Sequence, residues 1–199
     1  LEATPAQLVE ALAHPNGWHR DTAQKLLVLK QDKSVAPALI AMLQKNSSDL
    51  ARIHALWTLE GIGALDDDTI VTALKDPDAH VRRQAVLASE SHADSAKIAD
   101  ALKSAARDND AAVRFQIAAT AGAFPSETRL ALCRAIAATD ASNPWTRLAV
   151  LGSINNETFA FTKGLLEDKK TDIDAYAVAN FDFLAGLAEI VGRVDNPQD

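Results

Sequence analysis

Residues 75–87, KDPDAHVRRQAVL, combine a tight turn with the start of a helix. Asp76, Pro77 and Asp78 form the expected turn, and an apolar residue followed by an arginine, Val81 and Arg82, opens the helix. The arginine recurs at intervals of about 30 residues, a period typical of helical repeat proteins. It is found at Arg20, Arg52, Arg82, Arg114 and Arg147. This repeat predicts an α-solenoid, in which each unit is a helix pair that buries its apolar face against neighbouring pairs.

The spacing of apolar residues predicts an all-α fold, a right-handed α-α superhelix of about six helix pairs. No segment alternates apolar and polar residues over a strand length, so no sheet is expected. The chain starts at Leu1 without a methionine, and we expect it to be a fragment of a longer protein. The expected pairs form a single domain over residues 1–199 and lie at about 4–31, 34–62, 66–91, 95–123, 125–154 and 156–192.

Composition excludes several classes of function. The formal net charge of −7 argues against a surface built to hold a phosphate backbone, which needs a basic face. No apolar run reaches the length of about 18 residues that a membrane-spanning helix needs. A single cysteine, Cys133, leaves no intrachain disulfide and no multi-cysteine metal site. We therefore expect protein partners, with no nucleic acid, no membrane insertion and no cofactor.

Residues on either side of each turn carry a resemblance to a known family. In two consecutive units an aspartate stands five residues before a valine-arginine pair, at Asp76 and at Asp108. The sequence here resembles the HEAT repeat family, a group of armadillo-type helical repeats. The resemblance implies a polar ladder between successive repeats, made here of Arg20, Arg52, Asp76, Arg82, Asp108, Arg114 and Arg147. It weakens at the last of these arginines, where Ala141 occupies the aspartate slot and cannot pair.

Two longer strings carry a narrower resemblance. Residues 14–27 begin HPNGWHRDTAQ and residues 51–65 begin ARIHALWTLEG. They are similar to the HEAT region of large secreted bacterial proteins that look like dehydrogenases, in which a β-propeller precedes the repeats and a c-type cytochrome domain follows them. That resemblance implies a periplasmic or other extracytoplasmic location and a role as a linker between domains. The Cys-x-x-Cys-His motif that attaches haem is absent from this sequence.

No set of residues predicts a catalytic or metal site. No two of the five histidines, at positions 14, 19, 54, 80 and 92, share a helix face with a carboxylate, so we expect solvated or helix-end imidazoles. Cys133 lies among apolar helix residues and is interpreted as a small packed thiol. The run Asp66-Asp67-Asp68 lacks the spacing of a calcium loop and is interpreted as a helix cap.

The second helix of each pair offers a candidate binding surface. At 100° per residue, positions one, two and five after the arginine share a face opposite the buried positions three, four and seven. Aromatic and apolar side chains among neutral residues on this concave side favour a protein interface. The alternative is that Trp57 and Phe115 pack against neighbouring helices. The predicted partner-binding residues are Ile53, His54, Trp57, Arg83, Gln84, Leu87, Phe115 and Gln116.

Two further expectations concern tryptophans and the end of the chain. Trp18 and Trp145 stand two residues before an arginine, and we expect them to pack into the turns. A long final helix is expected from about Asp174 to Val191, apolar around most of its circumference. Such a helix is normally buried on several sides, so we expect part of it to be covered by a segment absent here.

Together these features predict a scaffold or docking module without catalytic activity, within a parent protein that can itself be a dehydrogenase. The resemblance favours a module that links domains of a larger extracytoplasmic redox enzyme. Two alternatives stay open: a stand-alone protein-binding adaptor, and a nucleic-acid-binding enzyme of the DNA glycosylase type, since some HEAT-like proteins have that activity. The acidic charge balance counts against the glycosylase.

Overall fold

The structure is a computed structural model that describes residues 3–154, 157–167 and 173–194. Within these ranges every regular element is a helix and no strand occurs, which confirms the predicted all-α class. The α-helices are α1 Pro5–Ala11, α2 Gly17–Lys30, α3 Ala36–Lys45, α4 Asp49–Gly61, α5 Asp67–Ala73, α6 Ala79–Ala88, α7 Ala96–Ala105, α8 Ala111–Thr120, α9 Ser126–Asp140, α10 Pro144–Ile154, α11 Thr158–Leu166, α12 Ile173–Ala179 and α13 Phe181–Val194. Three short 3-10 turns are η1 Lys33–Val35, η2 Ser89–His92 and η3 Ala121–Ala123.

Side-chain caps fix where most of the helices begin. Thr4 and Gln7 form a reciprocal capping box at the start of α1. The second helix of a pair is capped by a short polar side chain whose oxygen accepts a hydrogen bond from a backbone N–H in the first turn. The capping residues are Asn16 for α2, Ser48 for α4, Asp78 for α6 and Asp110 for α8. The turn residues seen in the sequence therefore start the helices that follow them.

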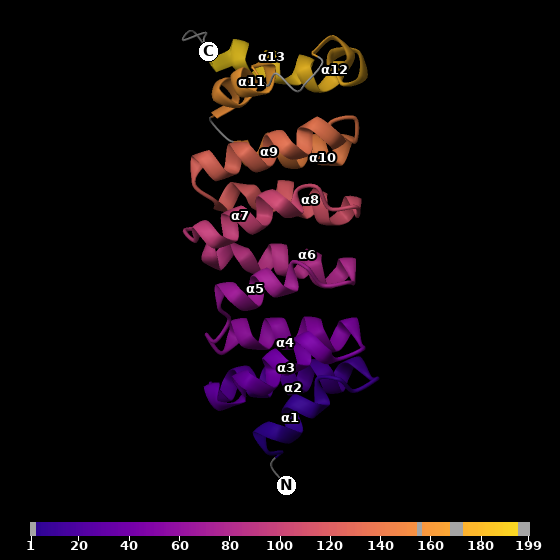
Figure 1. Ribbon diagram of the computed structural model, residues 1–199, viewed down its shortest axis with the longest axis vertical. Helices are drawn as coiled ribbons and strands as arrows, with labels where there is room; N and C mark the ends of the chain where they lie inside the picture. The colour runs from indigo at the N-terminus through magenta and orange to yellow at the C-terminus, as the bar shows by residue number, and fades with distance from the viewer. Residues whose placement is uncertain (1–2, 155–156, 168–172, 195–199) are drawn as a thin grey trace. The chain divides into compact units, whose positions relative to one another are not determined.

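The first of two compact units covers Leu1–Ala101. Three antiparallel pairs, α1 with α2, α3 with α4 and α5 with α6, succeed one another along this unit (Figure 1). The second helices α2, α4 and α6 pack on one another in a row, and the first helix α3 packs on α5. This two-layer arrangement is that of a HEAT-like α-solenoid.

The second unit covers Leu102–Asp199, and the boundary between the units falls inside α7. Here α9 pairs with α10, α8 packs on α10, and α11 packs on both α9 and α13. In Figure 1 the helices of this unit run from pink through orange to yellow.

The core of both units follows the repeat period. The residues three and seven positions after each arginine are buried in all five repeats, as the helical periodicity predicts, whereas at position four Gln24 and Leu151 are only half-buried. Position three holds Ala23, Ala55, Ala85, Ile117 and Val150, and position seven holds Leu27, Leu59, Ser89, Ala121 and Ile154. Small residues at position three of the first three pairs let neighbouring second helices approach closely.

Gly61 marks one such close approach, between α2 and α4. A Cβ atom added at Gly61 would lie 2.5 Å from Cγ2 of Val28, so no larger residue fits without a shift of that side chain. The carbonyl of Gly61 also accepts a hydrogen bond from Nε2 of Gln31 at 2.8 Å. The last turns of α2 and α4 are thus joined by both packing and a hydrogen bond.

The expected long helix from Asp174 to Val191 is wrong in one respect, since Asn180 divides it into α12 and α13. The N–H of Asn180 donates to the carbonyl of Tyr176 at 2.9 Å, and its own carbonyl accepts from the amides of Phe183 and Leu184. The Asn180 side chain donates to the same Tyr176 carbonyl at 3.1 Å. An asparagine that bonds its local backbone competes with the helix, and this is the physical reason for the break.

The helices on either side of the break each have buried and exposed apolar residues. Tyr176, Phe183 and Leu187 are buried, whereas Val178 and Phe181 are largely exposed. The side chain of Ile173 lies outside the described residues. The hydroxyl of Tyr176 donates to the carbonyl of Ala137 at 3.0 Å and so connects α12 to α9. Burial raises the pKa of Tyr176 to about 12, which keeps this hydroxyl protonated as a donor.

Candidate interaction surface on the second helices

The repeated arginine first closes its own turn. In four pairs the Nη1 atom donates to the backbone carbonyl of the residue six positions earlier, at distances between 2.7 and 2.9 Å. Carbonyls at the end of a helix have no intrahelical partner, and the arginine supplies one. The donors are Arg20, Arg52, Arg82 and Arg114, and the acceptors are His14, Asn46, Asp76 and Asp108.

Arg52 and Arg114 also contact a carboxylate of the next pair. Arg52 binds both carboxylate oxygens of Asp76, with Nε to Oδ2 at 2.8 Å and Nη2 to Oδ1 at 2.9 Å. Arg114 binds Asp140 in the same bidentate way, at 2.6 and 2.9 Å. The hydrogen bond to Asp140 raises the pKa of Arg114 above its usual range. Bidentate forks of this kind fix the register of one pair on the next.

Asp140 is a partner that sequence alignment missed. The repeat slot points to Ala141, which is buried and apolar, but α9 runs on to Asp140 and places the carboxylate one position earlier. An aspartate directly before the slot was the available signal. Arg147 makes a different contact, with Nη1 3.4 Å from Oδ2 of Asp182 on α13.

Among the residues that the structure describes, Arg20 has no comparable forward partner. Its Nη1 donates to the carbonyls of His14 and Pro15, but its Nε is buried with no hydrogen-bond partner. Asn46 stands in the slot that Asp76 holds for Arg52, and its Oδ1 accepts from the amide of Ser48 at 2.9 Å. The first pair therefore has an asparagine where Arg52 and Arg114 each meet an aspartate.

In the first unit the second-helix face, defined by positions one, two and five after each arginine, carries hydrogen bonds between neighbouring helices. Nε1 of Trp57 donates to Oε1 of Gln84 at 2.8 Å, which joins α4 to α6. Nδ1 of His54 lies 2.6 Å from Oε1 of Gln24, which joins α4 to α2. Ile53 and Arg83 are half-buried, and Leu87 is 36% exposed. Trp57 is thus tied to its neighbour through its polar edge.

His54 differs from the solvated or helix-end histidine that the sequence suggested. It lies in the middle of α4, and only 15% of its side chain is exposed. Burial lowers the pKa of His54, and the positive charge of Arg20 lowers it further, while Asp21 opposes the change. The imidazole therefore favours its neutral form.

In the second unit the same face is more apolar and more open. Phe115 on α8 is 37% exposed and Leu148 on α10 is 61% exposed, and the two occupy the same repeat slot on helices that pack together. Gln116 is half-buried and donates to the hydroxyl of Thr120 at 3.2 Å. Trp145 lies three residues before Leu148, on the same side of α10. We refer to Phe115, Trp145 and Leu148 as the α8–α10 patch.

The predicted packing of Trp18 and Trp145 into the turns is wrong. Trp18 is 67% exposed and Trp145 is 70% exposed. Both follow a capping asparagine, Asn16 or Asn143, that accepts a hydrogen bond from the tryptophan backbone N–H. In the first helical turn this arrangement leaves the indole on the outside, and Trp18 contacts only the ring of His19 at 5.1 Å among the aromatic residues described.

The remaining polar candidates have structural partners. Asp66 caps α5, and Asp67 binds Nδ1 of His92 at 2.7 Å and the hydroxyl of Ser95 at 2.5 Å. These bonds, first that of Ser95, hold the pKa of Asp67 below its usual range. Cys133 is fully buried, and burial raises the pKa of its thiol to about 12, which agrees with a packed thiol rather than a nucleophile.

One group brought together by the fold was not foreseen. Nδ1 of His80 lies 3.8 Å from a carboxylate oxygen of Asp49 and 3.7 Å from one of Asp78. Asp78 also caps α6 by accepting from the amide of His80 at 2.8 Å. All three side chains are at least partly exposed, and their place at two helix N-termini accounts for the negative charge.

The stacked pairs and their arginine forks define a helical repeat protein of the α-solenoid class. Residues 68–155, which contain Arg82 and Arg114, match the HEAT repeats family. A comparison with curated proteins gave no significant match. Among the described residues, no helix is both long and apolar enough to cross a membrane.

Proposed function

We propose that this chain is a non-catalytic protein-interaction scaffold that binds its partner through the second-helix face. The observation that carries the proposal is the exposure of the α8–α10 patch, where an aromatic residue and a leucine repeat in one slot of two neighbouring helices. Aromatic anchors surrounded by neutral residues are the usual centre of a protein interface. HEAT repeats commonly serve as such scaffolds, and the match over residues 68–155 supports the same role here.

Charge also favours a protein partner over a nucleic acid. Arg114 and Arg147, which precede Phe115 and Leu148, are already engaged with the carboxylates of Asp140 and Asp182. A guanidinium that is paired with a carboxylate is not available to neutralise a phosphate. We therefore expect no retention of the chain on heparin or DNA resin at low salt; firm retention would favour the glycosylase-type alternative.

The first unit contributes a more polar part of the proposed surface. Its residues are Ile53, His54, Trp57, Arg83, Gln84 and Leu87. Because Trp57 and Gln84 bond to each other, they hold their side chains in one conformation before a partner arrives. Preorganised side chains lose less conformational entropy on binding.

Photo-crosslinking in the source organism tests the surface and does not require the partner to be identified first. A photoreactive phenylalanine analogue replaces Phe115 or Leu148, and the same analogue at exposed Glu127 on α9 is the matched control. We expect one discrete crosslinked protein from the first two positions and none from the third. Identical products from all three positions, or none at all, would contradict the proposal.

The partner identified in this way then allows an affinity measurement. Phe115→Ala and Trp57→Ala should each weaken binding while the circular dichroism spectrum is unchanged. Unchanged affinity in both variants would remove the second-helix face as the binding site.

We further propose that the scaffold joins domains of a larger extracytoplasmic redox enzyme. Support comes from the resemblance of residues 14–27 and 51–65 to the repeat region of such proteins. The test is the reading frame that surrounds this sequence. A signal peptide and propeller-like repeats upstream, with a Cys-x-x-Cys-His motif downstream, would support the proposal; a frame without them would favour a stand-alone adaptor.

A further inference from the structure

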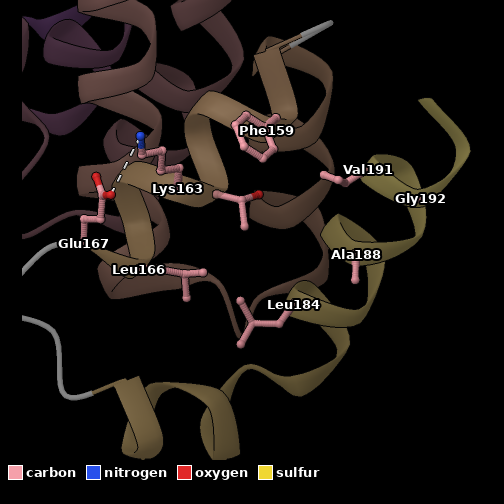
Figure 2. Close-up of a pocket in the computed structure, with 9 residues that line it drawn as sticks. Phe159, Lys163, Leu166, Glu167, Leu184, Ala188, Val191 and Gly192 are labelled. Carbon is pink, nitrogen blue, oxygen red and sulfur yellow. Dashed lines mark ion pairs between the residues drawn. The ribbon is translucent and has the colours of Figure 1, made fainter. Parts of the chain in front are cut away.

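An apolar groove lies between α11 and α13, and none of its lining residues belongs to the α8–α10 patch. Its volume is about 710 Å³. Figure 2 shows Phe159 and Leu166 of α11 facing Leu184, Ala188 and Val191 of α13 across the groove. Thr162 of α11 also lines it. Phe159 is 68% exposed and Leu166 is 53% exposed, so large apolar side chains meet solvent here.

The groove residues form two stripes at helical spacing. On each helix they recur every three or four positions over about two turns. They are distinct from the residues that this helix pair buries, which include Phe161 and Phe183 with their rings edge to face at 6.1 Å. The pair is therefore apolar on two sides, like α4, which packs on both α2 and α6. Helix packing on a second side is thus already the mode of association within this chain.

Hydrogen-bond accounting identifies the kind of occupant. The hydroxyl of Thr162 donates to the carbonyl of Thr158 at 2.8 Å, and Lys163 at the rim lies 3.9 Å from Glu167 (Figure 2). The described walls therefore present no array of donors or acceptors to a ligand. An extended peptide would leave its backbone groups unpaired against such walls, whereas an α-helix satisfies its own.

We propose that this groove binds an amphipathic α-helix of another polypeptide, with apolar residues at positions i, i+4 and i+7. Such a helix matches both stripes in length and lays one apolar face into a groove, a recurring mode of peptide recognition. A groove only about two helical turns long buries much less surface than the roughly 800 Å² per partner that a stable dimer interface needs. A second copy of the chain is therefore the less suitable occupant. The proposal uses no residue of the second-helix face and stands independently of it.

A designed peptide provides the probe. The peptide has about 14 residues of alanine, glutamate and lysine with leucines at i, i+4 and i+7, and a fluorescein label. Its control has the same composition with the leucines spread around the helix. Fluorescence anisotropy with the full chain should show saturable binding of the first peptide, about tenfold tighter than the control. Equal binding of both peptides would overturn the proposal.

Two variants of α13 locate the binding. Ala188 and Ala185 are both exposed, but only Ala188 lines the groove. Ala188→Arg should weaken peptide binding about tenfold, and Ala185→Arg should leave it within about twofold. Binding that survives Ala188→Arg would overturn the proposal. So would self-association of the free chain in analytical ultracentrifugation that Ala188→Arg abolishes, since that result assigns the groove to a second copy.

Discussion

Arg52 holds the carboxylate of Asp76 through two hydrogen bonds of 2.8 and 2.9 Å, and both side chains are more than nine-tenths buried. Asp76 also accepts a hydrogen bond from the backbone N–H of Asp78 at 2.8 Å. One carboxylate therefore joins α4 to the turn of the following pair. Removing one member of a buried pair leaves the other charge without compensation.

Asp76→Ala should therefore lower the free energy of unfolding by about 3 kcal/mol. Urea denaturation followed by circular dichroism measures the change. Asp94→Ala removes an exposed aspartate from the same unit and should change stability by less than about 0.5 kcal/mol. Equal losses of unfolding free energy in the two variants would show that the hydrogen bonds of the fork contribute nothing beyond the removal of one negative charge.

Asn46→Asp should stabilise the chain, because it supplies a carboxylate in the repeat slot that Asp76 holds for Arg52, and Nε of Arg20 is buried without a hydrogen-bond partner. The expected gain is about 1 kcal/mol, the net value of a charge-assisted hydrogen bond after the cost of desolvation. Thermal and urea unfolding measure it. Ser47→Asp adds the same charge at an exposed neighbouring position and should give no gain. The gain should also vanish when Arg20→Gln is combined with Asn46→Asp.

Gly61→Ala tests the close approach of α2 and α4. Alanine has the higher helix propensity, which alone would stabilise α4, but its Cβ would meet Val28 at 2.5 Å. We expect the clash to dominate and to lower the free energy of unfolding by about 1–2 kcal/mol. Combining it with Val28→Ala should recover most of that loss in a double-mutant cycle. A stabilising effect of the single substitution would show that Val28 moves aside at no cost.

His54 should make stability depend on pH. Because the folded state lowers its pKa below the usual value of 6.5, the unfolded chain binds the proton first as the pH falls. The contribution of His54 is therefore present above about pH 6.5 and is lost progressively below it. His54→Asn keeps a donor for Gln24 and removes the titration, so its stability should fall less than that of the parent chain between pH 7 and 5. Urea denaturation at each pH measures the change, and an unaltered pH dependence in His54→Asn would contradict this account.

The repeated arginine predicts the all-α solenoid class correctly because the slots around it alternate between buried and exposed positions with the helical period. That period depends only on backbone geometry and is readable from one sequence. The same period misplaces the partner of Arg114, because α9 continues to Asp140 and shifts the carboxylate by one residue. Side-chain pairing across repeats depends on where each helix ends, and aligning the repeats on their arginines does not predict that position.

Two other features depend on surroundings that a sequence does not state. Trp18 and Trp145 are apolar in composition but lie where no neighbouring helix covers them among the described residues. The break at Asn180 depends on a side-chain hydrogen bond to Tyr176, whereas the apolar pattern on either side continues as if the helix were whole. The groove between α11 and α13 is visible only once both helices are placed.

Arg52 and Arg114 each make one contact within their own pair and one with the next pair, and this has a consequence for the order of folding. The Nη1 bond of Arg52 closes a loop of six residues, whereas its fork to Asp76 spans 24, and the corresponding spans for Arg114 are six and 26. Short loops close at a smaller entropic cost than long ones. Each turn can thus form within its own pair, with the guanidinium already held in place when the following pair arrives to receive it. Chain growth from the N-terminus would then add pairs in sequence, each new carboxylate meeting an arginine that is already oriented toward it.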